Sequence, residues 1–203
     1  MEPFVRVKGI VAPLDRPNVD TDQVIPAQFL KRIERTGFGP FLFYHWRSLP
    51  DGKPNPSFEL NHPGYKGASI LATGRNFGCG SSREHAVWAL TDYGFRAIIA
   101  PSFAEIFHKN CLENGLVPVL VPEDLVAQII AMAKTIAGYQ LTVDLERCHV
   151  YDDLGLSAPF VVHADRETHE FRRHCLLNGL DEIGLTLQQE DKILEYERRR
   201  GIA

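Results

Sequence analysis

The feature that most constrains the fold is an alternation of short apolar runs with helical segments in the middle of the chain. Three runs have the length of buried strands and are bounded by Gly, Pro or polar residues: 69–72, 96–100 and 116–121. The segments that follow them have helical character: 81–93, 102–113 and 122–136. Strand–helix alternation predicts an α/β fold, and right-handed crossovers would make its strands parallel. Pro118 places the third strand at an edge.

Capping signatures mark the ends of the predicted helices. Ser81 and Ser102 are each followed three residues later by Glu, the pattern in which Ser caps a helix and the acid reaches back. Gly94 and Gly115 stand where helix C-caps belong. We therefore expect two helices that begin at these serines and end near these glycines.

The rest of the chain is less regular. The first third is rich in turn residues, and residues 50–56 predict a surface excursion. Three later segments predict an antiparallel layer: 140–146, 148–151 and 159–163. Thr168 and Thr186 are candidate caps of two final helices, ending at Leu177 and Arg200. We expect one α/β domain over residues 1–203, built as three β/β/α layers with a C-terminal helical extension over about 167–203.

Composition excludes several classes of protein. The chain has 203 residues, 44% of them hydrophobic and 24% charged, which is ordinary globular usage. A net charge of -4 argues against a nucleic-acid binder, and the only basic block is at residues 198–200. Neither a signal peptide nor an apolar stretch of membrane-spanning length is present, so we expect a soluble cytoplasmic chain with no membrane partner.

The four cysteines are far apart: Cys79, Cys111, Cys148 and Cys175. They form no C-x-x-C pair, and the histidines lack the H-x-x-x-H and H-E-x-x-H spacings. We expect no metal site in this chain and reduced thiols.

The richest chemistry lies at residues 74–86, with the sequence G-R-N-F-G-C-G-S-S-R-E-H-A. Here a strand passes through a glycine turn into a helix N-terminus, which offers free N–H groups and a positive dipole end to anions. Arg75 and Arg83 add bidentate donors for carboxylate or phosphate. The turn lacks the lysine of a Walker A loop, and Arg83 stands where a Rossmann fingerprint needs its third glycine.

The segment 78–86 resembles the G-x-G-S-S-R-E-H-A signature of the swivel domain in the aconitase superfamily. Further segments resemble the isopropylmalate dehydratase small-subunit branch of that superfamily, in order along nearly the whole chain: 18–26, 35–39, 91–95, 100–104, 171–174, 178–181 and 183–187. The resemblance implies a swivelling domain of a hydro-lyase that moves a hydroxyl between neighbouring carbons of isopropylmalate, by dehydration and rehydration, in leucine biosynthesis. It also implies a large partner subunit that carries a [4Fe–4S] cluster, a dicarboxylate substrate, and no cofactor in this chain.

The resemblance assigns roles to individual residues. Ser81 matches the serine that acts as an alkoxide base, and Arg83 would stabilise it and bind a carboxylate. Ser82 would donate to the substrate, and Asp22 would orient the base or substrate region, although an Asx-turn residue is an alternative. Arg32 and Arg35 are both candidates for a second carboxylate contact.

We prefer Arg35, with its neighbour Thr36, as the substrate-binding pair of this loop. Two readings of the whole chain stay open beside isopropylmalate dehydration. One is the small subunit of a homoaconitase or a citraconate hydratase. The other is a non-catalytic module that completes a partner's pocket; intact Ser81 and Arg83 argue against it.

Overall fold

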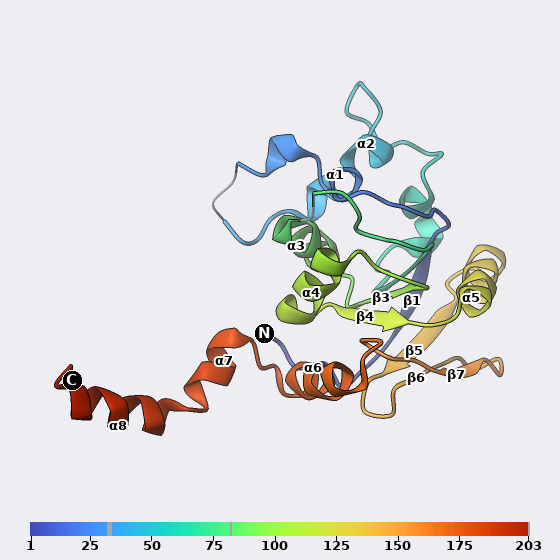
Figure 1. Ribbon diagram of the computed structural model, residues 1–203. Coiled ribbons are helices and arrows are strands. Elements are labelled where there is room, and N and C mark those ends of the chain that lie inside the picture. The colour runs from blue at the N-terminus through green and yellow to red at the C-terminus, as the bar shows by residue number, and fades with distance from the viewer. Residues whose placement is uncertain (32–33, 82, 203) are drawn as a thin grey trace.

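The computed structural model describes residues 1–31, 34–81 and 83–202 (Figure 1). The described strands form one sheet in the order β4-β3-β2-β1-β5-β6-β7. The strands are β1 Arg6–Leu14, β2 Ile70–Thr73, β3 Ala97–Ala100, β4 Val117–Leu120, β5 Gln140–Asp144, β6 His149–Tyr151 and β7 Ser157–Pro159. The α-helices are α1 Thr21–Val24, α2 Tyr44–Arg47, α3 Glu84–Tyr93, α4 Glu105–Asn114, α5 Glu123–Thr135, α6 Arg166–Asn178, α7 Glu182–Leu187 and α8 Glu190–Arg200. Short 3₁₀ turns lie between them at Ala27–Phe29, Gly39–Phe41, Glu59–Asn61 and Pro63–Tyr65.

Strand β1 joins two halves of the sheet. Its residues Val11–Leu14 pair in parallel with β2, and its residues Arg6–Ile10 pair antiparallel with β5. The strands β1 to β4 are therefore parallel and β5 to β7 antiparallel. Strand β1 was not predicted, because Gly9 and Pro13 interrupt its pattern.

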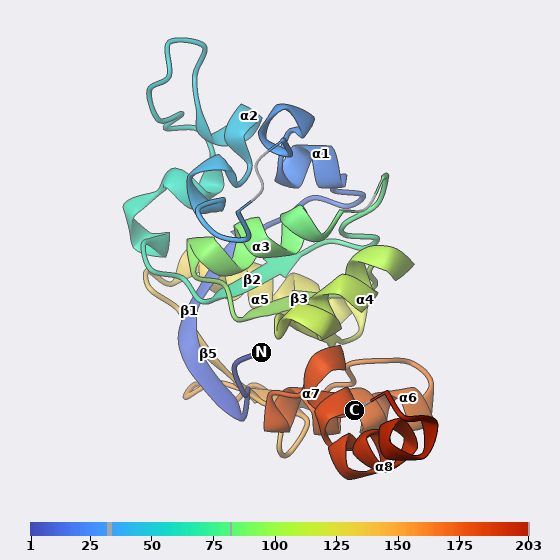
Figure 2. The ribbon, with the colours of Figure 1, turned by 90° about the vertical axis from the view of Figure 1, so that its left-hand side faces the viewer.

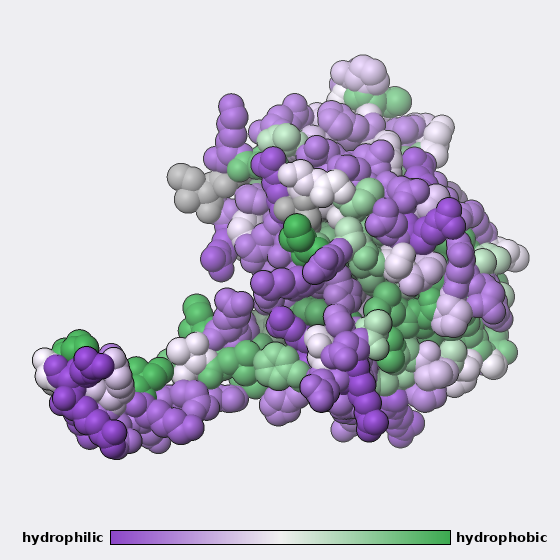
Figure 3. All heavy atoms as spheres, viewed as in Figure 1, coloured by the Kyte–Doolittle hydropathy of each residue, from purple (hydrophilic) through white to green (hydrophobic). Residues whose placement is uncertain are grey.

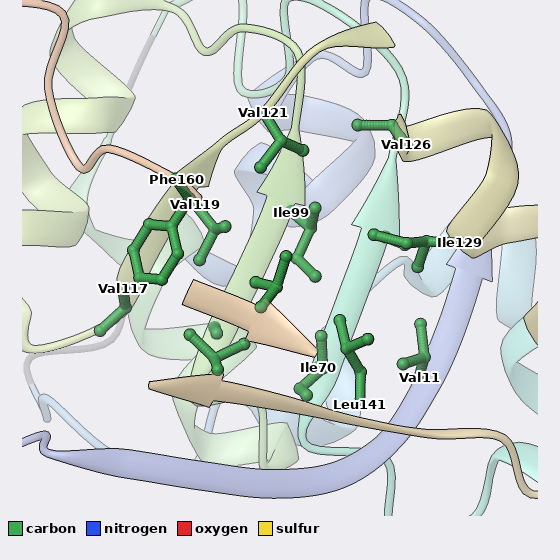
Figure 4. Packing of buried hydrophobic residues seen from close by; sticks show 14 of the residues in the cluster. Val11, Ile70, Ile99, Val117, Val119, Val121, Val126, Ile129, Leu141 and Phe160 are labelled. Atoms are coloured by element: carbon green, nitrogen blue, oxygen red, sulfur yellow. The ribbon is translucent and has the colours of Figure 1, made fainter. Parts of the chain in front are cut away.

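The two halves of the sheet face one another across a shared apolar core. Side chains from β1 to β4 meet side chains from β5, from α5 and from the segment after β7 (Figure 4). The labelled members are Val11, Ile70, Ile99, Val117, Val119, Val121, Val126, Ile129, Leu141 and Phe160. This packing makes the antiparallel half a second β layer.

The other face of the parallel half is covered by α3, α4 and the N-terminal loops. Alternate residues such as Leu71 and Ile98 point into this second core, whose large rings include Phe38, Phe77 and Phe107. Both faces of the parallel strands are thus buried, which explains why they read as continuous apolar runs. The arrangement confirms the predicted β/β/α fold class, and Pro118 lies on the edge strand β4 as expected.

Several local expectations were wrong. Ser102 does not cap α4; the cap position is Ala104, and Ser102 Oγ accepts instead from the backbone N–H of Asn76 at 2.9 Å. The cap of α6 is Asp165, whose carboxylate accepts from the N–H of Thr168 and is the stronger acceptor of the two. The strand expected at 159–163 is instead Ser157–Pro159.

The C-terminal helix predicted to start at Thr186 is two helices. Thr186 lies inside α7, and its hydroxyl donates to the carbonyl of Glu182 at 2.9 Å. Helices α7 and α8 extend away from the body of the molecule (Figures 1 and 3), and in Figure 2 they point toward the viewer. Apolar side chains are exposed along this arm at Ile183, Leu187 and Tyr196. Among the described residues, no helix has the length and apolar character that crossing a membrane requires.

Candidate active site

The turn between β2 and α3 is held between two neighbouring segments. On one side the N–H of Gly78 donates to the carbonyl of Val19 at 2.8 Å, and the N–H of Thr21 donates to the carbonyl of Cys79 at 2.9 Å. On the other side Phe77 forms an isolated bridge with Phe103. The turn lies beyond the carboxyl end of a parallel strand, where α/β folds place their ligands.

Two glycines in the turn cannot be replaced without strain. Gly78 and Gly80 have φ values of +78° and +84°. A Cβ at Gly78 would collide with the ring of Phe107, and one at Gly80 would collide with the carboxylate of Asp20, both inside the 3.0 Å limit for real contacts. At each of the two positions glycine is therefore needed for two reasons: it adopts a positive φ without strain, and it has no side chain.

Ser81 follows this turn and is exposed. Its carbonyl accepts from Thr21 Oγ1 at 3.1 Å, which ties its backbone to α1. The predicted capping box of Ser81 and Glu84 is wrong: α3 begins at Glu84, and Arg83 occupies the N-cap with an extended backbone and no side-chain cap bond. The left-handed Gly80 and the tie to Thr21 hold Ser81 outside the helix.

Helix α1 lies beside the turn and carries Asp22. Asp22 is exposed, and its N–H donates to Asp20 Oδ1 at 2.7 Å. Asp20 is the N-cap of α1 and forms a complete capping box with Gln23. Asp22 was predicted as a site residue and Asp20 was not, although the D-x-x-Q spacing of Asp20 and Gln23 indicates a helix cap.

Arg35 and Thr36 lie on a separate loop and are both exposed. The guanidinium carbon of Arg35 is 5.7 Å from the ring centroid of Trp88, in the second turn of α3. Arg35 and Glu84 both line a cleft of about 500 Å³. Helix α3 thus connects the Ser81 turn, at its amino end, to the Arg35 loop, which contacts Trp88. Arg32 and Ser82 lie outside the described residues.

Burial shifts the pKa of two side chains near the turn. It lowers the pKa of His85, and the nearby charge of Arg83 adds to this while Glu84 opposes it. It also raises the pKa of the Cys79 thiol, and the charge of Asp20 raises it further. In both side chains burial therefore favours the uncharged form.

The described residues do not suit a metal centre. No group of three or more His, Cys, Asp or Glu side chains gathers among them in a way that would hold an ion. The cysteines lie on separate parts of the fold: in the turn, in α4, before β6 and in α6. An iron–sulfur cluster, which needs several thiolates together, does not fit this set.

The sequence of the chain matches the models of two known domain families, of which the larger is the aconitase C-terminal domain. The model of the aconitase C-terminal domain matches residues 1–124, and residues 182–201 match the model of the C-terminal domain of the 3-isopropylmalate dehydratase small subunit. The crystal structure of a 3-isopropylmalate dehydratase from Methanocaldococcus jannaschii has a similar fold, with a TM-score of 0.65 and 22% identity over 95% of this chain and 99% of that one.

Bacterial relatives are much more similar in sequence. A 3-isopropylmalate dehydratase small subunit from Brevibacillus brevis is 58% identical over 98% of this chain and 100% of its own. One from Geobacillus kaustophilus is 56% identical over 98% of both chains. The chain belongs to the family of 3-isopropylmalate dehydratase small subunits, and the resemblance seen in its sequence is confirmed.

Proposed function

We propose that this chain is the small subunit of an enzyme that interconverts 2-isopropylmalate and 3-isopropylmalate through isopropylmaleate, as a hydro-lyase of leucine biosynthesis in the cytoplasm. The observation that carries the proposal is the exposed Ser81, which follows a fixed glycine turn and lies two residues before the N-cap of α3. Family membership supplies the reaction class. Residues 1–203 would act as one swivel-type domain, with the helices from about 167 onward as an extension.

Ser81 would be the base. Its alkoxide would take a proton from the carbon beside a substrate carboxylate, and the electrons of that C–H bond would form the double bond of isopropylmaleate. The C–O bond on the neighbouring carbon would break, and the hydroxide would leave as water after taking a proton from a general acid of the partner subunit. Rehydration would reverse these steps, with Ser81 returning its proton to carbon. Two features support an alkoxide here. The N-cap of α3 lies two residues beyond Ser81, and this position is Arg83, whose guanidinium would add positive charge. The hydrogen bond from Thr21 to the Ser81 carbonyl keeps the backbone in place.

Carboxylate binding would fall to Arg83 and to Arg35, with Ser82 and Thr36 as hydrogen-bond donors. Arginine suits this role because its planar fork matches a carboxylate. Asp22 stands on the neighbouring α1 and would orient the base region. Its exposure leaves it free to contact a substrate or a partner.

A partner subunit is needed because the site is open. Ser81, Asp22, Arg35 and Thr36 are all exposed, so a second surface has to exclude water from the reacting carbons. We propose that a large subunit supplies this surface and carries the [4Fe–4S] cluster, which this chain's cysteines do not suit. Its ligand would be a small dicarboxylate, with neither nucleic acid nor membrane as a partner.

The experiment is Ser81→Ala, with the exposed Ser157→Ala in β7 as its matched control. Each variant is combined with the cognate large subunit after cluster reconstitution, and isopropylmaleate is followed by its ultraviolet absorbance. We expect Ser81→Ala to lose activity by orders of magnitude with little change in melting temperature, and Ser157→Ala to keep both. Retained activity in Ser81→Ala would remove Ser81 as the base, and turnover of homoaconitate or citraconate alone would change the substrate.

A further inference from the structure

The last residue of α4, Asn114, makes three hydrogen bonds with its side-chain amide. Its Nδ2 donates to Glu84 Oε1 at 3.0 Å and to the carbonyl of Asn110 at 2.9 Å. Its Oδ1 accepts from Trp88 Nε1 at 3.0 Å. Both N–H donors and the carbonyl are used, so an Asn is specified here by its donor and acceptor pattern rather than by size.

Each of the two partners in α3 is a neighbour of one of the proposed arginines. Glu84 follows Arg83 directly, and it begins the helix. Trp88 has its ring 5.7 Å from the guanidinium carbon of Arg35. The indole N–H of Trp88 donates to Asn114 Oδ1, and this bond holds the orientation of the ring and so the face that a cation meets.

We propose that Asn114 is a positioning residue of the site: by holding Glu84 and Trp88 together, it sets where Arg83 and Arg35 present their guanidinium groups to the substrate carboxylates. This inference rests on the proposed function. Asn114, Glu84 and Arg35 line the same cleft, which is the geometry that such coupling requires.

The inference can be tested by exchanging the hydrogen-bond donor and acceptor between residues 114 and 84. In Asn114→Asp the new carboxylate still accepts from Trp88, but it loses both donations and repels Glu84. It also stands at the carboxyl end of α4, where the helix dipole disfavours a negative charge. Adding Glu84→Gln removes the repulsion, because the Gln amide can donate to the Asp carboxylate.

The readouts are kcat and KM of the reconstituted pair, measured well below every melting temperature. We expect kcat/KM to fall at least about tenfold in Asn114→Asp, and to recover in the double variant to within about threefold of the value measured for Glu84→Gln alone. Tyr139→Phe is the control for stability alone, because it removes a hydrogen bond to Asp152 in the antiparallel half. It should lower the melting temperature without changing kcat/KM.

A second readout does not depend on turnover. The side-chain protons of Arg35 next to the Trp88 ring should show a ring-current shift in NMR spectra of the small subunit. This shift should be lost in Asn114→Asp and return in the double variant. Unchanged kinetics and an unchanged Arg35 shift in Asn114→Asp would overturn the inference, as would a double variant as impaired as the single one. If the unsubstituted pair does not turn over isopropylmalate, the proposed function fails, and the Arg35 shift alone decides the inference.

Discussion

Replacing Gly80 by Ala tests two requirements of the glycine turn at this position: a left-handed backbone and the absence of a side chain. An L-residue in the left-handed region costs roughly 1–2 kcal/mol. The new Cβ would also push the Asp20 carboxylate away from the N–H of Asp22, and the loss of such a cap costs about 1 kcal/mol. We expect Gly80→Ala to lower the free energy of unfolding by about 2–3 kcal/mol, which leaves an ordinary domain folded.

Gly138→Ala is the matched control, because Gly138 has φ +70° and open space where a Cβ would go. It should carry only the backbone strain, about 1–2 kcal/mol. Urea unfolding followed by fluorescence measures both free energies, and equal m-values would show that the comparison is valid.

Activity should separate the two variants more strongly than stability does. Gly80 precedes Ser81, the base that we propose, and a misplacement of about 1 Å at a reacting group costs on the order of 100-fold in rate. We expect Gly80→Ala to lose activity to about that extent in the reconstituted pair, and Gly138→Ala to keep it. The reasoning is refuted if the two variants match in both unfolding free energy and turnover.

Two further expectations concern titratable groups. Burial lowers the pKa of His169, whose Nδ1 accepts from the N–H of Val162 at 3.1 Å. The unfolded chain therefore binds a proton near pH 6.5 that the folded chain resists, so stability falls as the pH drops below that value. The difference in unfolding free energy between pH 7.5 and pH 5.5, measured in urea, should shrink in His169→Gln; an unchanged difference would contradict this. Burial also raises the pKa of Cys111 well above its usual value. Mass spectrometry after iodoacetamide treatment should find Cys111 unmodified while the chain stays folded, and labelling of Cys111 as fast as Cys79 would be inconsistent with the structure.

The parallel half of the fold was predictable because its signals are local. The runs that became β2 to β4 are apolar on both faces, and Gly94 and Gly115 end α3 and α4 where expected. Strand β1 was missed because what defines it is pairing with β2 and β5, which lie far along the chain. Gly9 and Pro13 hide it from any test of periodicity.

In the candidate site, too, the local features could be predicted and the long-range contacts could not. The glycine turn with Ser81 and Arg83 was found because its residues are neighbours in sequence. The start of α3 was misplaced because a bond from Thr21, 60 residues away, holds Ser81 outside the helix. Asn114 had no signal in the sequence, since its partner Glu84 is 30 residues distant.

The two-sided pairing of β1 also governs how the molecule opens. Residues Arg6–Ile10 of β1 pair with β5 and residues Val11–Leu14 pair with β2, so opening either half of the sheet breaks a ladder of this one strand. Exchange of the β1 amide protons with deuterium should require global unfolding, whereas amides in the projecting α8 should exchange through fraying. The slowest-exchanging amide protons would then lie in β1, the strand that was not predicted from the sequence.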